Sequence, residues 1–252
     1  MKIWKAHFSD EKHDTHIDII NTEGTFSDDS LSFTINGTDF FGSGFDDFHL
    51  TSPEKYDFDT NEFQLLKWGT KNKGYEYSLQ RFSMEITIPF PVINIKTNKT
   101  ENSFLRIKYA CEQSKENERS VQCILDDEVV FGDVYKMYDF SLHINKEIYK
   151  SNNSLFFYFE DNLIDIYRKI KNKYMMKCCF TCQWSDYSPY GNSDFGTMMC
   201  YRKHKEEYSK VNDKETYFKY ADNLDFESKQ ETYICREYEP RIHFSGYRGF
   251  IE

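Results

Sequence analysis

The chain has 252 residues, of which 39% are hydrophobic and 18% aromatic, and its formal net charge is −10. This length suits one large domain or two small ones, and either can bury a core, built here largely from aromatic rings. The acidic balance disfavours binding to a phosphate backbone, and no apolar run is long enough to span a membrane. Neither nucleic acid nor a membrane is therefore an expected partner.

The negative charge is concentrated in the first part of the chain. Residues 1–150 contain 17 Lys and Arg against 26 Asp and Glu, whereas residues 151–252 contain 15 against 16. Such a field attracts a basic partner protein and speeds its encounter. The alternative interpretation is that the acidity only keeps the protein soluble.

Short strands dominate the first 150 residues. The segments 16–20 and 31–35 alternate apolar and polar residues, and Asn36-Gly37 after the second is a strong hairpin signal. Similar patterns follow at 75–90, 104–110, 121–125, 128–131 and 138–144, with polar turns between them. This arrangement predicts an antiparallel, sandwich-like β domain over residues 1–154. Cys111 and Cys123 lie inside strand patterns and are expected to be small buried apolar residues.

Residues 39–63 mix carboxylates with aromatic rings, and Lys55 is the one basic residue among them. One interpretation is a loop whose rings fill the core while its carboxylates face water. The other is a surface for a basic partner, on which rings anchor the complex and carboxylates steer it. The candidate partner-binding residues are Asp46, Asp47, Asp57, Asp59, Phe45 and Phe48.

A helix is expected after residue 160. Asp161 and Asn162 can cap it, and an apolar face recurs at Leu163, Ile166, Tyr167 and Ile170. This helix opens a second domain, residues 155–252. The predicted fold class is therefore α+β and mostly β, with an N-terminal antiparallel domain, a linking helix and a small C-terminal module that binds metal through four cysteines.

The C-terminal module contains Cys179 and Cys182 at a spacing that lets two thiolates of one tight turn meet one ion. Cys200 and Cys235 follow in strand-like runs and complete a tetrahedral set. Four thiolates with no open position predict a structural zinc ion. The alternative is four reduced cysteines without metal.

Two further residues leave the ligand set open. Cys178 adjoins Cys179 but points the opposite way on a strand, and His204 is a rival fourth ligand. The residues expected to pack around the metal turn are Asp186, Tyr187, Tyr190 and Arg248.

Several runs carry a family resemblance. They are Cys178-Cys-Phe-Thr-Cys-Gln-Trp-Ser-Asp-Tyr-Ser-Pro-Tyr-Gly191, then residues 195–202, Gln230-Glu-Thr-Tyr-Ile-Cys235 and Gly246-Tyr-Arg-Gly249. Over roughly residues 160–252 they resemble a family of uncharacterised bacterial proteins that share a cysteine-tetrad C-terminal region and have variable N-terminal parts. The family has no assigned reaction. Its size, acidity and setting are similar to those of immunity proteins, which block a bacterial toxin by binding it.

Motifs for catalysis are missing from the sequence. There is no HExxH, P-loop, G-x-G-x-x-G or G-x-S-x-G, and the local pair His13 and His16 reads as a solvated turn. We therefore expect a non-catalytic protein that binds a basic toxin domain. The alternative is a zinc- or thiol-dependent enzyme or redox protein that uses the C-terminal cysteines. The odd cysteine count and the lack of a signal peptide indicate the cytoplasm. The sequence leaves open the oligomeric state and the toxin's chemistry.

Overall fold

The computed structural model describes residues 1–23, 30–70, 74–113, 121–125, 128–132, 134–152, 158–191, 195–242 and 246–247. The chain forms two compact units. The first unit comprises Met1–Thr22, Ser30–Ile88 and Arg106–Asp139, and the second consists mainly of Pro89–Leu105 and Phe140–Glu252. The expected domain boundary at residue 154 remains a prediction.

Most strands belong to one 11-stranded sheet with the order β15-β14-β11-β8-β1-β2-β3-β4-β5-β7-β6. The mostly β, antiparallel fold expected from the sequence is confirmed. The sandwich-like arrangement stays a prediction; in the described residues these strands hydrogen-bond into a single sheet. Their bounds are β1 Lys2–Ser9, β2 Asp14–Thr22, β3 Ser30–Ile35, β4 Thr38–Gly42, β5 His49–Leu50, β6 Leu65–Thr70, β7 Gly74–Leu79, β8 Phe82–Pro89, β11 Ser103–Gln113, β14 Val134–Ile144 and β15 Glu147–Lys150.

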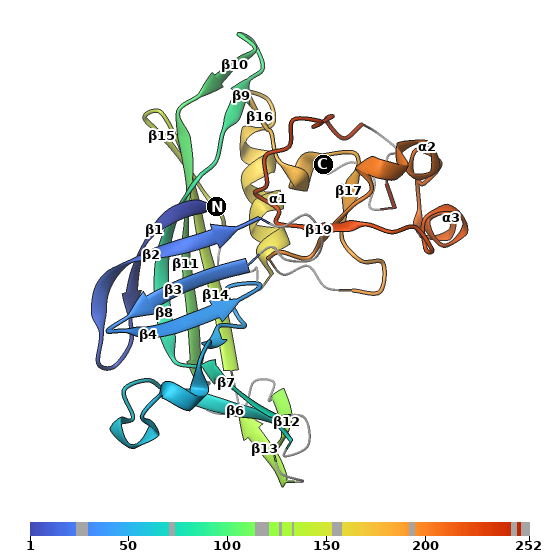
Figure 1. Cartoon of the computed structure of the whole chain (residues 1–252). Coiled ribbons are helices and arrows are strands. Elements are labelled where there is room, and N and C mark those ends of the chain that lie inside the picture. The colour runs from blue at the N-terminus through green and yellow to red at the C-terminus, as the bar shows by residue number, and fades with distance from the viewer. Residues whose placement is uncertain are drawn as a thin grey trace. The chain divides into compact units, whose positions relative to one another are not determined.

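The first unit begins with hairpins that follow directly from the sequence, and β1 to β4 lie side by side in chain order (Figure 1). The β3–β4 turn has positive φ angles of 50° at Asn36 and 83° at Gly37, the backbone that Asn-Gly favours in a two-residue hairpin. The predicted hairpin is therefore confirmed. The unit also contains the separate hairpin of β12 (Val121–Leu125) and β13 (Glu128–Gly132).

The core of the first unit is built from rings, as the composition predicted. Alternate residues of β1, β2 and β8 are buried, so one face of these strands carries the apolar side chains. Phe8 and Phe82 stack with their ring centroids 5.8 Å apart, and Phe33 meets Phe48 edge-on at 4.8 Å. Offset and edge-on ring pairs stabilise a core beyond the area that they bury.

In the second unit, the predicted helix is α1, Phe159–Ile170, which packs against β15 and β16 (Tyr174–Met176). It begins earlier than expected, at the N-cap Tyr158, and no side chain caps it. Phe159 is fully buried, which accounts for the extra turn, and the side chain of Asn162 donates to the Tyr158 carbonyl instead of capping. β16 pairs with β9 (Val92–Asn94), which also pairs with β10 (Lys99–Glu101).

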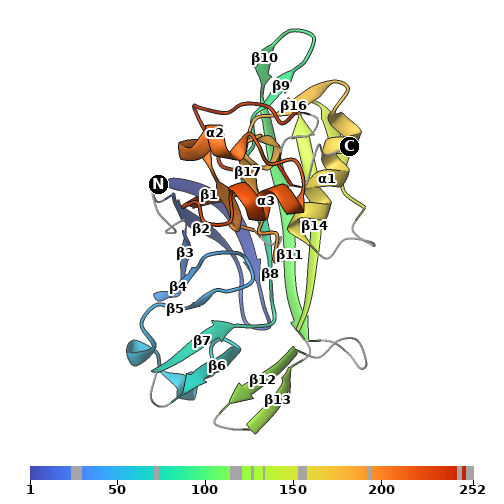
Figure 2. The ribbon, with the colours of Figure 1, turned by 90° about the vertical axis from the view of Figure 1, so that its right-hand side faces the viewer.

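The last part of the second unit contains the cysteines. Its three-stranded sheet consists of β17 (Ser185–Asp186), β18 (Met198–Cys200) and β19 (Glu227–Lys229). Two short helices, α2 (Lys205–Tyr208) and α3 (Lys214–Tyr220), lie close together (Figure 2). The sequence did not predict them, although Asp213 and Thr216 form a capping box for α3. The strand expected at residues 231–236 is wrong, since that segment is irregular.

Among the helices of the described residues, none has the length and apolar character needed to cross a membrane.

Candidate functional sites

The first unit contains a concave pocket of about 480 Å³. It lies between the β1–β2 turn, residues 56–65 and strands β6 and β7. Its lining residues are Asp10, Glu11, Lys12, Tyr56, Phe58, Asn61, Glu62, Phe63, Gln64, Leu65, Lys67 and Tyr77. Three of these residues are carboxylates and four are aromatic, so the acidic-aromatic segment of the sequence forms one wall of the pocket.

A short 3₁₀ turn, Phe58–Thr60, shapes that wall. The Asp57 side chain caps it by accepting from the Asp59 amide at 3.1 Å, and Asn61 ends it in the left-handed region with a φ of 47°. Asparagine tolerates this conformation better than most residues. The Tyr56 hydroxyl accepts from the Phe63 amide at 3.0 Å, which closes the loop on itself. The wall is therefore held by its own hydrogen bonds.

Aromatic rings line the pocket on this side. Phe58 meets Tyr56 edge-on at 4.9 Å and Tyr77 at 4.6 Å. Its side chain is nevertheless 41% exposed, which is unusual for a ring so well surrounded. An exposed aromatic ring beside carboxylates suits the recognition of a cation.

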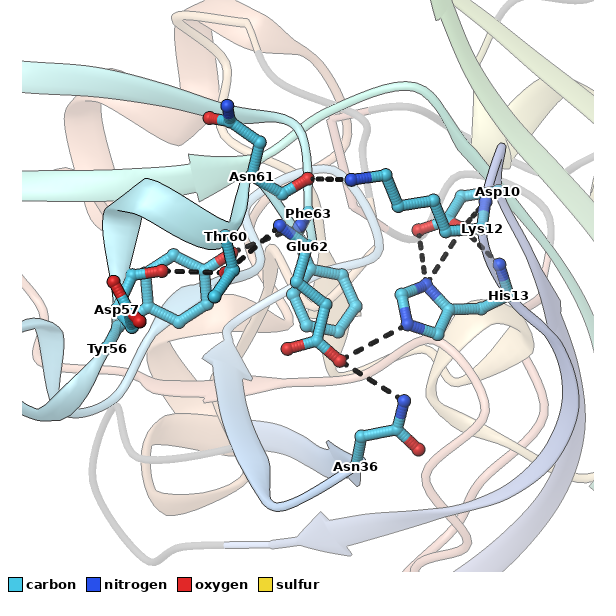
Figure 3. A network of polar contacts seen from close by, with 10 residues as sticks. All are labelled: Asp10, Lys12, His13, Asn36, Tyr56, Asp57, Thr60, Asn61, Glu62 and Phe63. Carbon is cyan, nitrogen blue, oxygen red and sulfur yellow. Dashed lines mark hydrogen bonds and ion pairs between the residues drawn. The ribbon is translucent and has the colours of Figure 1, made fainter.

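A polar network joins the wall to the β1–β2 turn (Figure 3). The His13 ring is only 8% exposed and stacks on Phe63 at 4.6 Å. Its Nδ1 lies 2.9 Å from Asp10 Oδ1 and its Nε2 lies 3.4 Å from Glu62 Oε1. Lys12 Nζ donates to the Asn61 carbonyl at 2.5 Å. The solvated turn expected at His13 is therefore a buried hydrogen-bonded contact.

The predicted partner-binding residues do not all reach the surface. Phe45 and Phe48 are 0% and 1% exposed, so they belong to the core. Asp47 accepts from the amides of Ser43 and Gly44 at 3.0 and 2.8 Å, which is a structural role in the turn. Asp46 is half-buried, and Asp57 and Asp59 are exposed on either side of the pocket residue Phe58 in the sequence. None of the six predicted residues is among those that line the pocket. Glu11 and Lys12 were not predicted because long-range pairing brings the β1–β2 turn beside the 39–63 segment.

The cysteines of the second unit are all buried. Cys179, Cys182, Cys200 and Cys235 are 2%, 5%, 7% and 8% exposed, and each is a free thiol. A 3₁₀ turn, Cys179–Thr181, brings the first two together, and the Cys182 amide donates to the Cys179 carbonyl at 3.0 Å. Because β17 pairs with β18, Ser185 lies opposite Cys200. The Cys179 amide donates to the Tyr233 carbonyl at 3.0 Å, close to Cys235.

Burial favours the protonated form of the thiols of Cys178, Cys179, Cys182 and Cys200. It raises the pKa of Cys200 to about 11 and that of Cys178 to about 12, and it also raises the pKa of Cys179 and Cys182. As the described residues stand, no three His, Cys, Asp or Glu side chains are arranged to hold a metal ion.

Two of the residues expected around the metal turn lie beside it. Asp186 is fully buried, and it accepts from the Tyr208 hydroxyl at 3.0 Å and from Arg241 Nη1 at 3.3 Å. Arg241 also donates to the carbonyls of Cys182 and Ser185, so this ion pair supports the turn directly. Tyr187 is 2% exposed.

The other expected residues have different positions. Tyr190 is 74% exposed, and its hydroxyl donates to Asp222 at 2.9 Å. Arg248 lies outside the described residues. His204, the rival ligand, pairs with Asp225 at 2.6 Å.

A second concavity of about 500 Å³ lies beside the cysteines. Its lining residues are Arg202, Lys203, Tyr233, Ile234, Cys235, Arg236 and Glu237. Arg202 Nη1 lies 3.6 Å from the Cys235 sulfur, and its Nη2 donates to Glu227 at 2.5 Å. Cys235 therefore borders an opening.

Comparison with known proteins gives one match. No curated protein and no solved structure matched the chain. Residues 2–185 match the model of a family of unknown function, DUF6304. The resemblance expected from the sequence lay in residues 160–252, but most of the matched length precedes residue 160. The match includes Cys179 and Cys182 and ends before Cys200. Since it covers well over half of the residues, the chain belongs to the DUF6304 family, whose function is unknown.

Proposed function

We propose that this protein is a non-catalytic, cytoplasmic partner-binding protein of the immunity type, which neutralises a bacterial toxin by binding it. The observation that carries the proposal is the pocket of the first unit, whose lining combines the exposed Phe58 ring with three carboxylates. A partner with a basic surface fits this chemistry, because carboxylates steer it and an exposed ring anchors it.

The charge of the surrounding residues supports a basic partner. The surplus of acidic side chains lies in residues 1–150, and Glu11, Asp57 and Asp59 are exposed on or next to the pocket wall. The Lys12 ammonium donates a hydrogen bond to the Asn61 carbonyl at 2.5 Å. The pocket therefore contains a carbonyl acceptor that suits a cation. A Lys or Arg side chain of the partner would find rings and oxygens together here.

The buried positions of Phe45 and Phe48 change which residues we expect at the interface. Both rings would have to leave the core to touch a partner. Phe58 replaces them as the proposed anchor, with Glu11 and Asp59 as the proposed steering charges. Phe45 and Phe48 pack in the core instead, where Phe45 meets Tyr109 and Phe48 meets Phe33.

A thiol enzyme or redox protein is the second candidate, and the opening beside Cys235 favours it. A nucleophilic or redox cysteine needs a lowered pKa, since the thiolate is the reactive form. Burial instead raises the pKa of Cys179, Cys182 and Cys200. These three thiols are therefore poor candidates for a nucleophile, and the thiol alternative depends on Cys235 alone.

The test uses the product of the neighbouring gene as the immobilised partner and measures binding by biolayer interferometry. Phe58→Ala should raise the dissociation rate about tenfold, because an interface anchor is lost. Phe41→Ala is the matched control: its ring comes from the same segment and is 40% exposed, but it does not line the pocket.

Equal effects of the two variants would move the interface away from the pocket. Absence of binding by the unmodified protein, with iodoacetamide labelling confined to Cys235, would favour the thiol alternative.

A further inference from the structure

We infer that the second unit holds one zinc ion through the sulfurs of Cys179, Cys182, Cys200 and Cys235. This inference does not depend on the proposed partner binding. It rests on how the backbone surrounds these four sulfurs, which the spacing of the cysteines alone could not show.

Three chain segments converge at the cysteines. The backbone of residues 179–183 is hydrogen-bonded to that of residues 231–241: Phe180 donates to Glu231 at 3.1 Å, and Gln183 donates to Glu239 at 3.0 Å. The Tyr201 amide donates to the Trp184 carbonyl at 2.8 Å, which fixes the third segment next to Cys200. Backbone pairing therefore gathers the four cysteines before any metal binds.

The four thiols are also mutual neighbours. They are 2%, 5%, 7% and 8% exposed at Cys179, Cys182, Cys200 and Cys235, and the backbone hydrogen bonds described above bring their segments together. Four ionised sulfurs so close together and so well buried would repel each other strongly. A bound Zn²⁺ removes that repulsion, because each thiolate then has a cation as its neighbour.

Backbone amides point at three of the four sulfurs in the same way. The Cys182, Cys200 and Cys235 sulfurs each accept from the amide two residues further along, which belongs to Trp184, Arg202 and Glu237 respectively. For Cys235 the distance is 3.3 Å. A neutral thiol is a weak acceptor, whereas a metal-bound thiolate needs such donors around it. The Cys178 sulfur likewise accepts from the amides of Phe180 and Thr181, so these donors surround the cysteine cluster as a whole and do not by themselves select the ligands.

Two arginines balance the charge of the site. Four thiolates and one Zn²⁺ carry a net charge of −2. Arg202 lies 3.6 Å from the Cys235 sulfur, and Arg241 acts electrostatically on Cys182. Both guanidinium groups are also held by a carboxylate, Glu227 or Asp186, which fixes their position. The unit thus supplies positive charge on two sides of the proposed centre.

Cys179, rather than Cys178, is the proposed fourth ligand. Its amide donates to the Tyr233 carbonyl at 3.0 Å, next to Cys235, and its spacing from Cys182 lets two thiolates of one turn meet one ion. The side chains must still turn towards a common point when the ion binds, because the described residues do not enclose one as they stand.

The experiment measures the zinc content of the full-length protein, purified under reducing conditions without chelator. We expect close to one equivalent. Replacement of the metal with Co²⁺ should produce thiolate-to-metal charge-transfer absorption and the intense visible bands of a tetrahedral site. Cys179→Ser and Cys200→Ser should each lose at least nine-tenths of the bound metal, and Cys178→Ser and Cys111→Ser should retain it.

Two results would overturn the assignment. One is unmodified protein that binds neither zinc nor Co²⁺ after reduction and reconstitution. The other is Cys178→Ser losing the metal while Cys179→Ser keeps it. If the serine variants fail to fold, chelator is added to the unmodified protein, which should release one zinc and lower the melting temperature. Release of no zinc would count equally against the site.

Discussion

Arg241 Nη1 lies 3.3 Å from Asp186 Oδ2, and the two side chains are 2% and 0% exposed. The same guanidinium donates to two backbone carbonyls of the cysteine turn, those of Cys182 and Ser185. Burial raises the pKa of Asp186, and the neighbouring Arg241 opposes that rise. The pair therefore ties the C-terminal segment to the turn at residues 182–186, even though 55 positions separate the two residues.

Asp186→Asn should destabilise the protein. The substitution leaves the Arg241 charge buried without its counter-charge, which costs about 3–5 kcal/mol when a buried pair loses one partner. Denaturant unfolding measures the loss. Glu147→Gln is the control, because it breaks the exposed pair with Lys173 and should leave the midpoint unchanged. Equal midpoints for Asp186→Asn and the unmodified protein would contradict a structural role of the pair.

Stability should fall as the pH rises through neutrality, because of Glu231. Burial raises the pKa of this carboxyl from 4.5 to about 8. Between these two values the folded protein keeps the proton and the unfolded chain has released it, so raising the pH favours unfolding by a few kcal/mol.

The measurement is the free energy of unfolding at several pH values from 4.5 to 8.5. Glu231→Gln should flatten the profile, whereas Glu206→Gln, at an exposed position, should not. A profile for Glu231→Gln that still falls as steeply as that of the unmodified protein would show that another group titrates.

Gly69→Ala should destabilise the β6–β7 hairpin more than Gly37→Ala destabilises the β3–β4 hairpin. Both glycines have positive φ, 101° and 83°, so both substitutions carry a backbone cost of about 1 kcal/mol. Only at Gly69 would a Cβ atom meet another atom, the Gly74 carbonyl oxygen. Thermal unfolding of the two variants compares them. A lower melting temperature for Gly37→Ala would contradict the expected contact.

The acidic residues of the 39–63 segment should separate into two classes. Asp47→Asn should cost about 1 kcal/mol of stability, because Asp47 accepts from two backbone amides. Asp59→Asn should leave stability unchanged and slow association with a basic partner, with an effect that weakens as salt is added. Stopped-flow association at two salt concentrations distinguishes the classes. If Asp59→Asn associates at low salt as fast as the unmodified protein, the proposed steering role of Asp59 is contradicted.

Local features of the chain were readable from the sequence. Alternating residues predicted the antiparallel strands, Asn36-Gly37 predicted its hairpin, and the spacing of Leu163, Ile166 and Ile170 predicted the buried face of α1. These signals are local because the side-chain period of a strand or helix depends only on its own backbone. The cysteine turn at residues 179–182 was predictable for the same reason.

What only the tertiary structure decided depends on residues far apart in the chain. The alternation of apolar and polar residues shows that a ring can be buried, but it does not show which ring stays exposed. In the structure Phe45 and Phe48 lie in the core, whereas Phe58 is exposed. His13 contacts Glu62 because the β1–β2 turn lies against residues 56–63. Arg241 contacts Asp186 because the C-terminal segment pairs with the cysteine turn. The alternation of side chains along a strand does not show which other strands will lie next to it. That choice is made by the burial and hydrogen bonding of the whole unit.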